Sequence, residues 1–95
     1  MNHVKVEGWP ALEVVERYVP QAEVAARCSE YVSTRWMAPV ACAQFDFVNA
    51  RCYIWYSADD PPSAATIAHE RLHCQGYDHV GDSTLRDLIR GQGPD

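Results

Sequence analysis

The spacing of apolar positions in the first third of the chain indicates a series of short elements. Residues 3–9 fit a short edge strand. Leu12, Val15 and Val19 recur with the period of one helix face, up to a proline that ends the pattern. From residue 21 to about residue 32 the apolar side chains fall at i, i+4, i+7 and i+8, which predicts a second and stronger helix. We therefore expect an N-terminal helical region that packs on the core.

Two strand-like runs follow, at residues 40–48 and 51–57, and both are rich in apolar and aromatic side chains. Asn49 tolerates the positive φ of a tight turn, so the two runs are predicted to form a β-hairpin. A two-residue turn would pair Phe47 with Cys52. A register shift of one residue would exchange the two faces of the hairpin, so the register stays open at this point.

A helix is predicted from about residue 61 to residue 75, with Asp60 as its N-cap. Its small-residue face allows close packing on the hairpin. Residues 84–90 give a last short helix with inward apolar side chains, and residues 91–95 a flexible tail. The expected architecture is one α+β domain over residues 1–95. In it, a short antiparallel sheet or hairpin and the N-terminal helical region support one central helix.

Length and charge limit the class of protein. Ninety-five residues suffice for one domain, which at this size buries about 60 to 65% of its unfolded surface. The net charge is −5 and the eight Lys and Arg residues are scattered, which argues against a nucleic-acid partner. No apolar run is long enough to cross a membrane, and the N-terminus lacks the apolar core of a signal peptide. We expect a cytoplasmic protein without a membrane partner.

The four cysteines form no CxxC pair, which disfavours a zinc ribbon or a thioredoxin-like site. In a reducing compartment they would be mostly buried thiols. Their even number leaves disulfides open if the protein is exported by another route. Cys74 directly follows a candidate metal ligand, and we expect it to be a buried packing thiol.

The chemistry is concentrated in one stretch that contains three of the chain's four histidines. His69 and His73 lie one helical turn apart on the same face, so their ring nitrogens can bind one ion. Gly76 can adopt the left-handed conformation that ends the helix and turns the chain back. His79 then arrives as a third ligand. Three neutral nitrogens with one position left for water are the arrangement of a catalytic Zn²⁺ site.

Glu70 is rotated by roughly 100° from His69 around the helix, too far to be an easy third ligand. Its carboxylate can still reach the water at the open position, so we interpret Glu70 as the general base. The main alternative is a structural zinc site closed by a fourth protein ligand, for which Cys74 and Asp82 are the candidates.

The stretch from His69 to His79 resembles the HExxHxxGxxH zinc signature of the metzincin metallopeptidases. The resemblance implies that His69, His73 and His79 bind Zn²⁺ and that Glu70 deprotonates the attacking water. Metzincins also have a methionine turn after the third histidine, whereas both methionines of this chain precede the motif. The resemblance is therefore to a reduced zincin-like domain, of the kind found in small proteins of phages and integrated mobile elements.

The same stretch also resembles the HGxLHxxGYDH signature of a bacterial zinc endoribonuclease family involved in ribosomal RNA maturation. Leu72, Gly76, Tyr77 and Asp78 match that signature, as do the three histidines. The ribonucleases have glycine after the first histidine, where this chain has Glu70. We expect a zinc metallopeptidase. The alternatives are a zinc-dependent endoribonuclease and a zinc-stabilised interaction module that is not an enzyme.

Weaker roles fall to residues outside the ligand set. In zincins the strand before the zinc helix commonly carries the extended substrate, so the resemblance implies a peptide lying against Tyr53 and Trp55. The alternative is that both side chains belong to the core. Tyr77 is a candidate oxyanion donor or a packed turn residue, and Asp78 a partner of a ligand histidine or a turn residue. His3 is expected to be exposed and remote. The expected partner is a peptide or protein substrate, and a partner protein or larger assembly is the alternative to activity of the chain alone.

Overall fold

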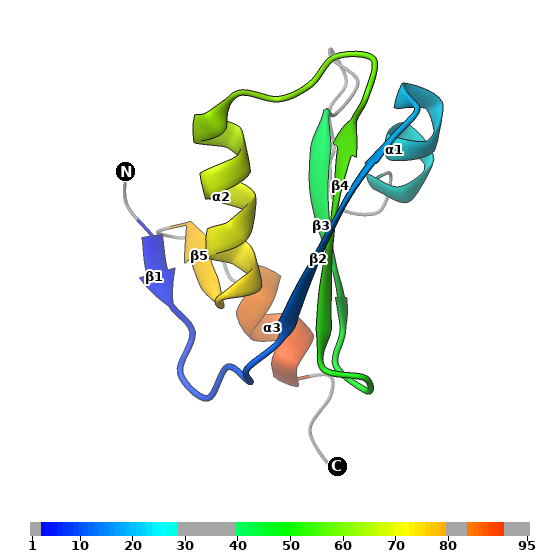
Figure 1. Cartoon of the computed structure of the whole chain (residues 1–95). Coiled ribbons are helices and arrows are strands. Elements are labelled where there is room, and N and C mark those ends of the chain that lie inside the picture. The colour runs from blue at the N-terminus through cyan, green and yellow to red at the C-terminus, as the bar shows by residue number, and fades with distance from the viewer. Residues whose placement is uncertain (1–2, 29–39, 80–83, 91–95) are drawn as a thin grey trace.

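The computed structural model describes residues 3–28, 40–79 and 84–90. Within these ranges the chain forms the predicted α+β class of fold (Figure 1). The elements are β1 (His3–Lys5), β2 (Glu13–Val19), α1 (Gln21–Cys28), β3 (Ala41–Asp46), β4 (Arg51–Ser57), α2 (Ala64–Cys74), β5 (Tyr77–His79) and α3 (Thr84–Arg90). None of the helices in these ranges is long and apolar enough to span a membrane. The helix predicted from residue 21 extended to about residue 32, and its part beyond Cys28 lies outside the described residues, as does the predicted tail.

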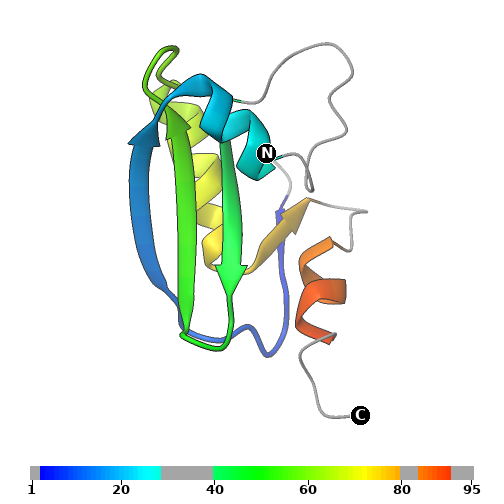
Figure 2. The ribbon, with the colours of Figure 1, turned by 90° about the vertical axis from the view of Figure 1, so that its right-hand side faces the viewer.

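A three-stranded mixed sheet forms the centre of the fold. β4 is the middle strand, parallel to β2 and antiparallel to β3. α1 covers one face of this sheet and α2 covers the other, as Figures 1 and 2 show from two directions. β1 and β5 form a separate two-stranded antiparallel sheet at the C-terminal end of α2. α3 follows and packs against β5.

The segment 13–19 is a strand, and the helix predicted there is wrong. It pairs in parallel with the whole of β4, from Glu13 opposite Arg51 to Val19 opposite Ser57. A spacing of four residues between valines fits one face of a helix and also one face of a strand, so the pattern alone was ambiguous. Valine and tyrosine occupy four of the seven positions, and both favour strands. The distant partner β4 therefore decides the conformation.

The predicted β-hairpin is confirmed, with a longer turn than expected. The pairing begins at Asp46 and joins Phe45 to Cys52, so residues 47–50 form the turn. The Asp46 carboxylate accepts hydrogen bonds from the backbone and side-chain amides of Asn49, which stabilises this turn. The register differs from the predicted one by two residues. Because this shift is even, every side chain keeps its predicted face.

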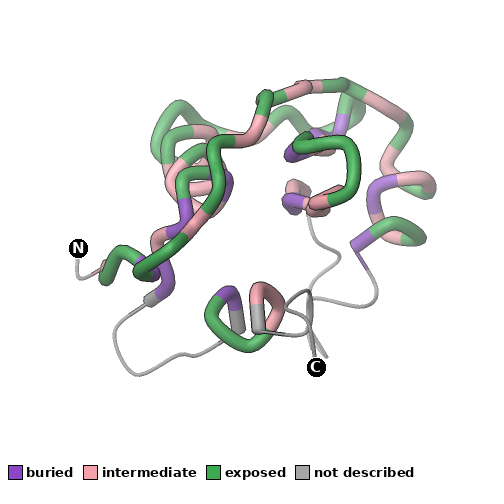
Figure 3. The backbone as a smooth tube through the Cα atoms, turned by 90° about the horizontal axis from the view of Figure 1, so that it is seen from below, coloured by how far each residue is buried: buried purple, intermediate pink, exposed green. Residues whose placement is uncertain are grey.

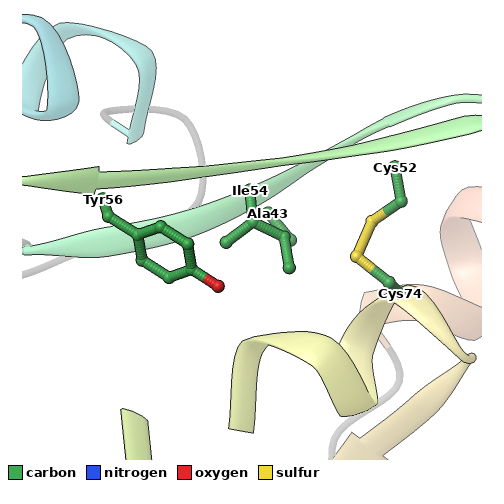
Figure 4. Packing of buried hydrophobic residues seen from close by; sticks show 5 residues of the cluster. All are labelled: Ala43, Cys52, Ile54, Tyr56 and Cys74. Atoms are coloured by element: carbon green, nitrogen blue, oxygen red, sulfur yellow. A yellow bond between two sulfur atoms is a disulfide. The ribbon is translucent and has the colours of Figure 1, made fainter. Parts of the chain in front are cut away.

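Each face of the sheet has its own buried cluster and its own disulfide bond. On the α1 side, Cys28 is bonded to Cys42. On the α2 side, Cys52 of β4 is bonded to Cys74, the last residue of α2. The buried side chains on this side are Ala43, Cys52, Ile54, Tyr56 and Cys74 (Figure 4). Along β4, buried residues alternate with half-buried ones, because the α2 face is covered more completely than the α1 face. Figure 3 shows buried, half-buried and exposed positions over the described chain.

The two disulfides correct the expectation of free thiols. Both bonds join elements that are neighbours in the fold, α1 to β3 and β4 to α2. Cys74 is buried as predicted, but its sulfur is covalently bound and is not a thiolate. It therefore cannot be the fourth ligand of a structural zinc site in this form of the protein.

A polar network at the edge of the core joins β2, β4 and α2. The hydroxyl of the buried Tyr56 donates to the Glu16 carboxylate at 2.5 Å. Arg71 of α2 donates to both oxygens of the same carboxylate, at 3.1 Å and 3.0 Å. The Arg71 hydrogen bond, and then the Tyr56 hydrogen bond, lower the pKa of Glu16. Burial and the Glu16 carboxylate raise the pKa of Tyr56 well above its usual range. Glu16 is thus an ionised acceptor that ties α2 to the sheet.

We predict that Glu16→Gln lowers the free energy of unfolding by about 1 to 2 kcal/mol at pH 7, measured by urea denaturation. Because the folded state depresses the pKa of Glu16, the ionised carboxylate stabilises the protein above the ordinary value of 4.5. This stabilisation is lost as the pH falls through the depressed folded pKa. The difference between wild type and variant should therefore shrink on acidification.

The matched control is Glu23→Gln, which removes an exposed i, i+4 ion pair with Arg27. We expect this control to change stability by only about 0.3 to 0.5 kcal/mol. Equal losses in the two variants, or a Glu16→Gln effect that persists unchanged in acid, would contradict the assigned role of Glu16.

Candidate metal centre

The helix that carries the candidate site begins later than predicted. Ser63, and not Asp60, is the N-cap of α2. Ser63 has extended backbone angles, φ −68° and ψ 163°, and its hydroxyl accepts from the backbone N–H of Thr66 at 3.2 Å. Asp60 lies before the helix, where its N–H donates to the Ser57 hydroxyl at 3.0 Å. The later start leaves the candidate ligands in the second half of α2.

His69 and His73 meet at the tips of their rings. Their Nε2 atoms are 3.1 Å apart, and both side chains are half-buried. Two nitrogen ligands of a tetrahedral ion, each about 2.0 Å from it, are about 3.3 Å apart, so the pair fits a shared Zn²⁺. The Nδ1 atom of His73 lies 2.8 Å from the carbonyl oxygen of Tyr77. A carbonyl can only accept, so this Nδ1 carries the proton and Nε2 offers its lone pair towards His69.

Glu70 lies closer to the histidine pair than its helical position suggests. One carboxylate oxygen of Glu70 and one ring nitrogen each of His69 and His73 all lie within 4.8 Å of one another. The Glu70 side chain is half-buried and has interactions of its own. The carboxylate is therefore near enough to contact a molecule bound at the histidine pair, or to bind an ion there itself.

The chain reverses at Gly76, as predicted. Gly76 has φ +89°, and it follows the C-cap residue Gln75 directly. A Cβ atom at this position would lie 2.3 Å from Cγ of Trp9, so the indole packs directly on the glycine backbone. Both the backbone angle and the space at residue 76 therefore require glycine.

The N-terminal segment binds the carbonyl groups at the end of α2. Trp9 Nε1 donates to the carbonyl of Cys74 at 3.0 Å, and Lys5 Nζ donates to that of Gln75 at 2.6 Å. The N–H of Val6 donates to the carbonyl of Gly76 at 2.7 Å. Helix ends leave such carbonyls without intrahelical partners. Here three consecutive carbonyls, those of residues 74–76, accept hydrogen bonds from one segment near the N-terminus.

This docking brings His3 to the histidine pair. β1 pairs with β5 so that His3 lies opposite His79. The His3 ring centroid lies 5.1 Å from that of His69 and 6.1 Å from that of His73, edge-on to both. The expectation that His3 is exposed and remote is therefore wrong. No local pattern pointed to it, because only the pairing of β1 with β5 makes it a neighbour.

The predicted third ligand is described only through its backbone. β5 brings the backbone of His79 back beside the end of α2, opposite His3. The His79 side chain and Asp82 lie outside the described part of the structure. The role of His79 as a ligand therefore stays a prediction from the sequence.

The predicted substrate strand is not available to a peptide. β4 is paired on both sides, with β2 and with β3, so its backbone groups are already used. Tyr53 and Trp55 project to the α1 face of the sheet, whereas their neighbours Ile54 and Tyr56 pack on the α2 side. Trp55 donates to Gln44 Oε1 at 2.7 Å and stacks on Tyr53. The sheet separates both aromatic residues from His69 and His73, which favours the alternative that they pack on the α1 face.

Tyr77 and Asp78 have local roles in the described structure. The Tyr77 ring lies 5.3 Å from the ammonium of Lys5, its partner on β1, and the Tyr77 carbonyl orients His73. The buried Asp78 carboxylate accepts from the backbone N–H groups of Leu85 at 2.9 Å and Arg86 at 3.3 Å. Asp78 thus fixes the start of α3, and the contact predicted for it with a ligand histidine is made by a backbone carbonyl.

The sequence matches no protein-family model, and no curated protein or solved structure matches it significantly. The site is therefore interpreted from its own geometry and from the chemistry of its side chains.

We predict that Gly76→Ala lowers the free energy of unfolding by about 3 kcal/mol or more, because the new Cβ meets Trp9 at a positive φ. Gly8→Ala is the matched control, since Gly8 has φ +80° but no atom lies within 4 Å of the place that a Cβ would take there. The control should lose only about 1 kcal/mol. Chemical denaturation measures both. If both variants lost the same unfolding free energy, the packing of Trp9 on Gly76 would contribute nothing beyond the backbone angle.

Proposed function

We propose that this protein is a zinc-dependent peptidase built on a small zincin-like domain. One observation carries the proposal. Two histidine nitrogens from adjacent turns of α2 lie 3.1 Å apart, and the Glu70 carboxylate is close to both. Imidazole nitrogens suit Zn²⁺, and a carboxylate next to them can act as a base or as a further ligand.

Each residue of the site has a distinct task in the proposed reaction. His69 and His73 hold the metal, with His79 as the predicted third ligand, and the Tyr77 carbonyl keeps His73 in the required tautomer. Zn²⁺ would polarise the peptide carbonyl and lower the pKa of the attacking water. Glu70 accepts a proton from that water as its oxygen adds to the carbonyl carbon. The same carboxyl returns the proton to the amide nitrogen as the C–N bond breaks.

The position of β3 favours a new place for an extended substrate. β3 is an edge strand and packs against α2. Among the described residues its only strand partner is β4, so the backbone groups on its outer side can pair with an added strand. We therefore propose that a peptide or protein substrate extends along the outer side of β3, next to the helix that carries the histidine pair.

A zinc-stabilised module without activity is the second candidate. A structural zinc site needs a fourth protein ligand, and Cys74 cannot supply it because it is disulfide-bonded. The support for this candidate is His3, whose nearby ring offers a nitrogen instead. Nothing comparable favours the endoribonuclease, because the net charge is −5 and the alternative requires binding to phosphates. The two disulfides favour an oxidising compartment over the cytoplasm as the place of action. A partner protein or larger assembly stays a prediction.

The proposal predicts that Glu70→Gln binds one equivalent of zinc but hydrolyses peptides at least about 100-fold more slowly than wild type. The amide keeps the size of the side chain and removes the base. Zinc content is measured by elemental analysis after dialysis, and hydrolysis by mass spectrometry on a mixed peptide library. His73→Ala should lose both zinc and activity.

Glu23→Gln, whose side chain on α1 is 42% exposed, is the control for a non-specific loss of zinc or activity. A peptide hydrolysis that survives Glu70→Gln would overturn the proposed mechanism. Cleavage of single-stranded RNA that needs His73 but not Glu70 would favour the ribonuclease. One tightly bound zinc without hydrolysis of either substrate would favour the non-enzymatic module.

A further inference from the structure

His3 is the one histidine outside the sequence motif, and the fold brings its ring next to the pair on α2. We propose that His3 contacts the substrate and donates a hydrogen bond to the carbonyl oxygen that gains negative charge during hydrolysis. The inference deepens the proposed peptidase function and rests on it. Preorganised donors aimed at such an oxygen are among the largest contributions to catalysis in hydrolases.

The backbone of His3 is held in place by a docked segment. β1 is paired with β5 from His3 to Lys5, and Lys5 and Val6 bind the consecutive carbonyls of Gln75 and Gly76. Trp9 completes this attachment by packing on Gly76 and donating to Cys74. A donor for a transition state must be fixed before the reaction, and this attachment supplies the fixation.

The distances favour a residue that borders the metal site over one that belongs to the ligand set. The His3 ring is edge-on to the rings of His69 and His73, with interplanar angles of 66° and 69° and centroids 5.1 Å and 6.1 Å away. Among the described residues, the group whose ligand atoms all lie within 4.8 Å of one another consists of His69, Glu70 and His73, without His3. His3 therefore borders the histidine pair, beside which a reacting carbonyl would bind.

The chemistry of the side chain suits the task. A neutral imidazole always carries one N–H, so His3 can donate without a change of protonation. The residue is half-buried and its Nε2 atom is fully buried, which limits competition from water. Glu70 supplies an acceptor next to the histidine pair, and His3 supplies a donor. A hydrolytic site requires both.

The test uses inorganic phosphate as a tetrahedral oxyanion and needs no known substrate. Wild type, His3→Ala and His3→Gln are loaded with Co²⁺, and the visible spectrum reports metal affinity and phosphate binding separately. His3→Ala should keep its Co²⁺ affinity within about twofold and bind phosphate roughly 10- to 100-fold more weakly, as expected for loss of one hydrogen bond to a charged group. His3→Gln, which retains an N–H donor, should recover part of the phosphate affinity.

Val4→Ala is the matched control, because Val4 is the next residue of the same strand and is 53% exposed. It should leave both affinities unchanged, and circular dichroism checks that β1 and the helices of every variant remain folded. Unchanged phosphate binding in His3→Ala would overturn the inference alone. Loss of Co²⁺ from His3→Ala, as from His73→Ala, would make His3 a ligand and overturn the donor role. Failure of wild type to bind any metal would overturn the proposed function and this inference with it.

Discussion

The end of α2 is held at three consecutive residues, and both the core and the candidate site depend on this attachment. Cys74 is bonded to Cys52 on the middle strand of the sheet, which fixes how the helix lies across it. Gly76 then reverses the chain at φ +89° with the Trp9 ring against its backbone. Because His73 precedes Cys74 directly, the same attachment sets the position of one histidine of the pair. The N-terminal segment supplies donors to all three carbonyls, so the helix end is satisfied within the protein itself.

The candidate site is assembled from α2 and from the two strands attached at its end. α2 alone provides His69, Glu70 and His73, which are close in sequence. The His3 ring and the Tyr77 carbonyl beside them come from β1 and β5, which lie far apart in the sequence and pair with each other. A small domain has few buried apolar side chains to stabilise it. Here two disulfides and the Glu16 network supplement the core at the points where α1 and α2 meet the sheet.

The local sequence pattern predicted the elements that neighbouring residues determine. It failed for those whose conformation or position depends on pairing with a strand distant in sequence. The helix with His69 and His73, the left-handed Gly76 and the hairpin could all be predicted, because turn chemistry and side-chain period determine them. The strand 13–19 could not, since its valine spacing fits both periods and β4 decides between them. That Tyr53 and Trp55 share one face of the sheet followed from the hairpin, but the central place of β4 did not. His3 had no local signal at all.

The disulfide at Cys74 limits which side chains could bind the proposed metal. Cys74 follows His73 directly in the sequence, so in a reduced chain its thiol was a candidate for the fourth ligand of a closed structural site. Zn²⁺ binds thiolates strongly, and sulfur ligands are typical of closed structural sites. The bond to Cys52 removes that donor and holds it in the core beneath α2. With this bond formed, His69, Glu70 and His73 remain as the candidate ligands of α2 for the proposed metal.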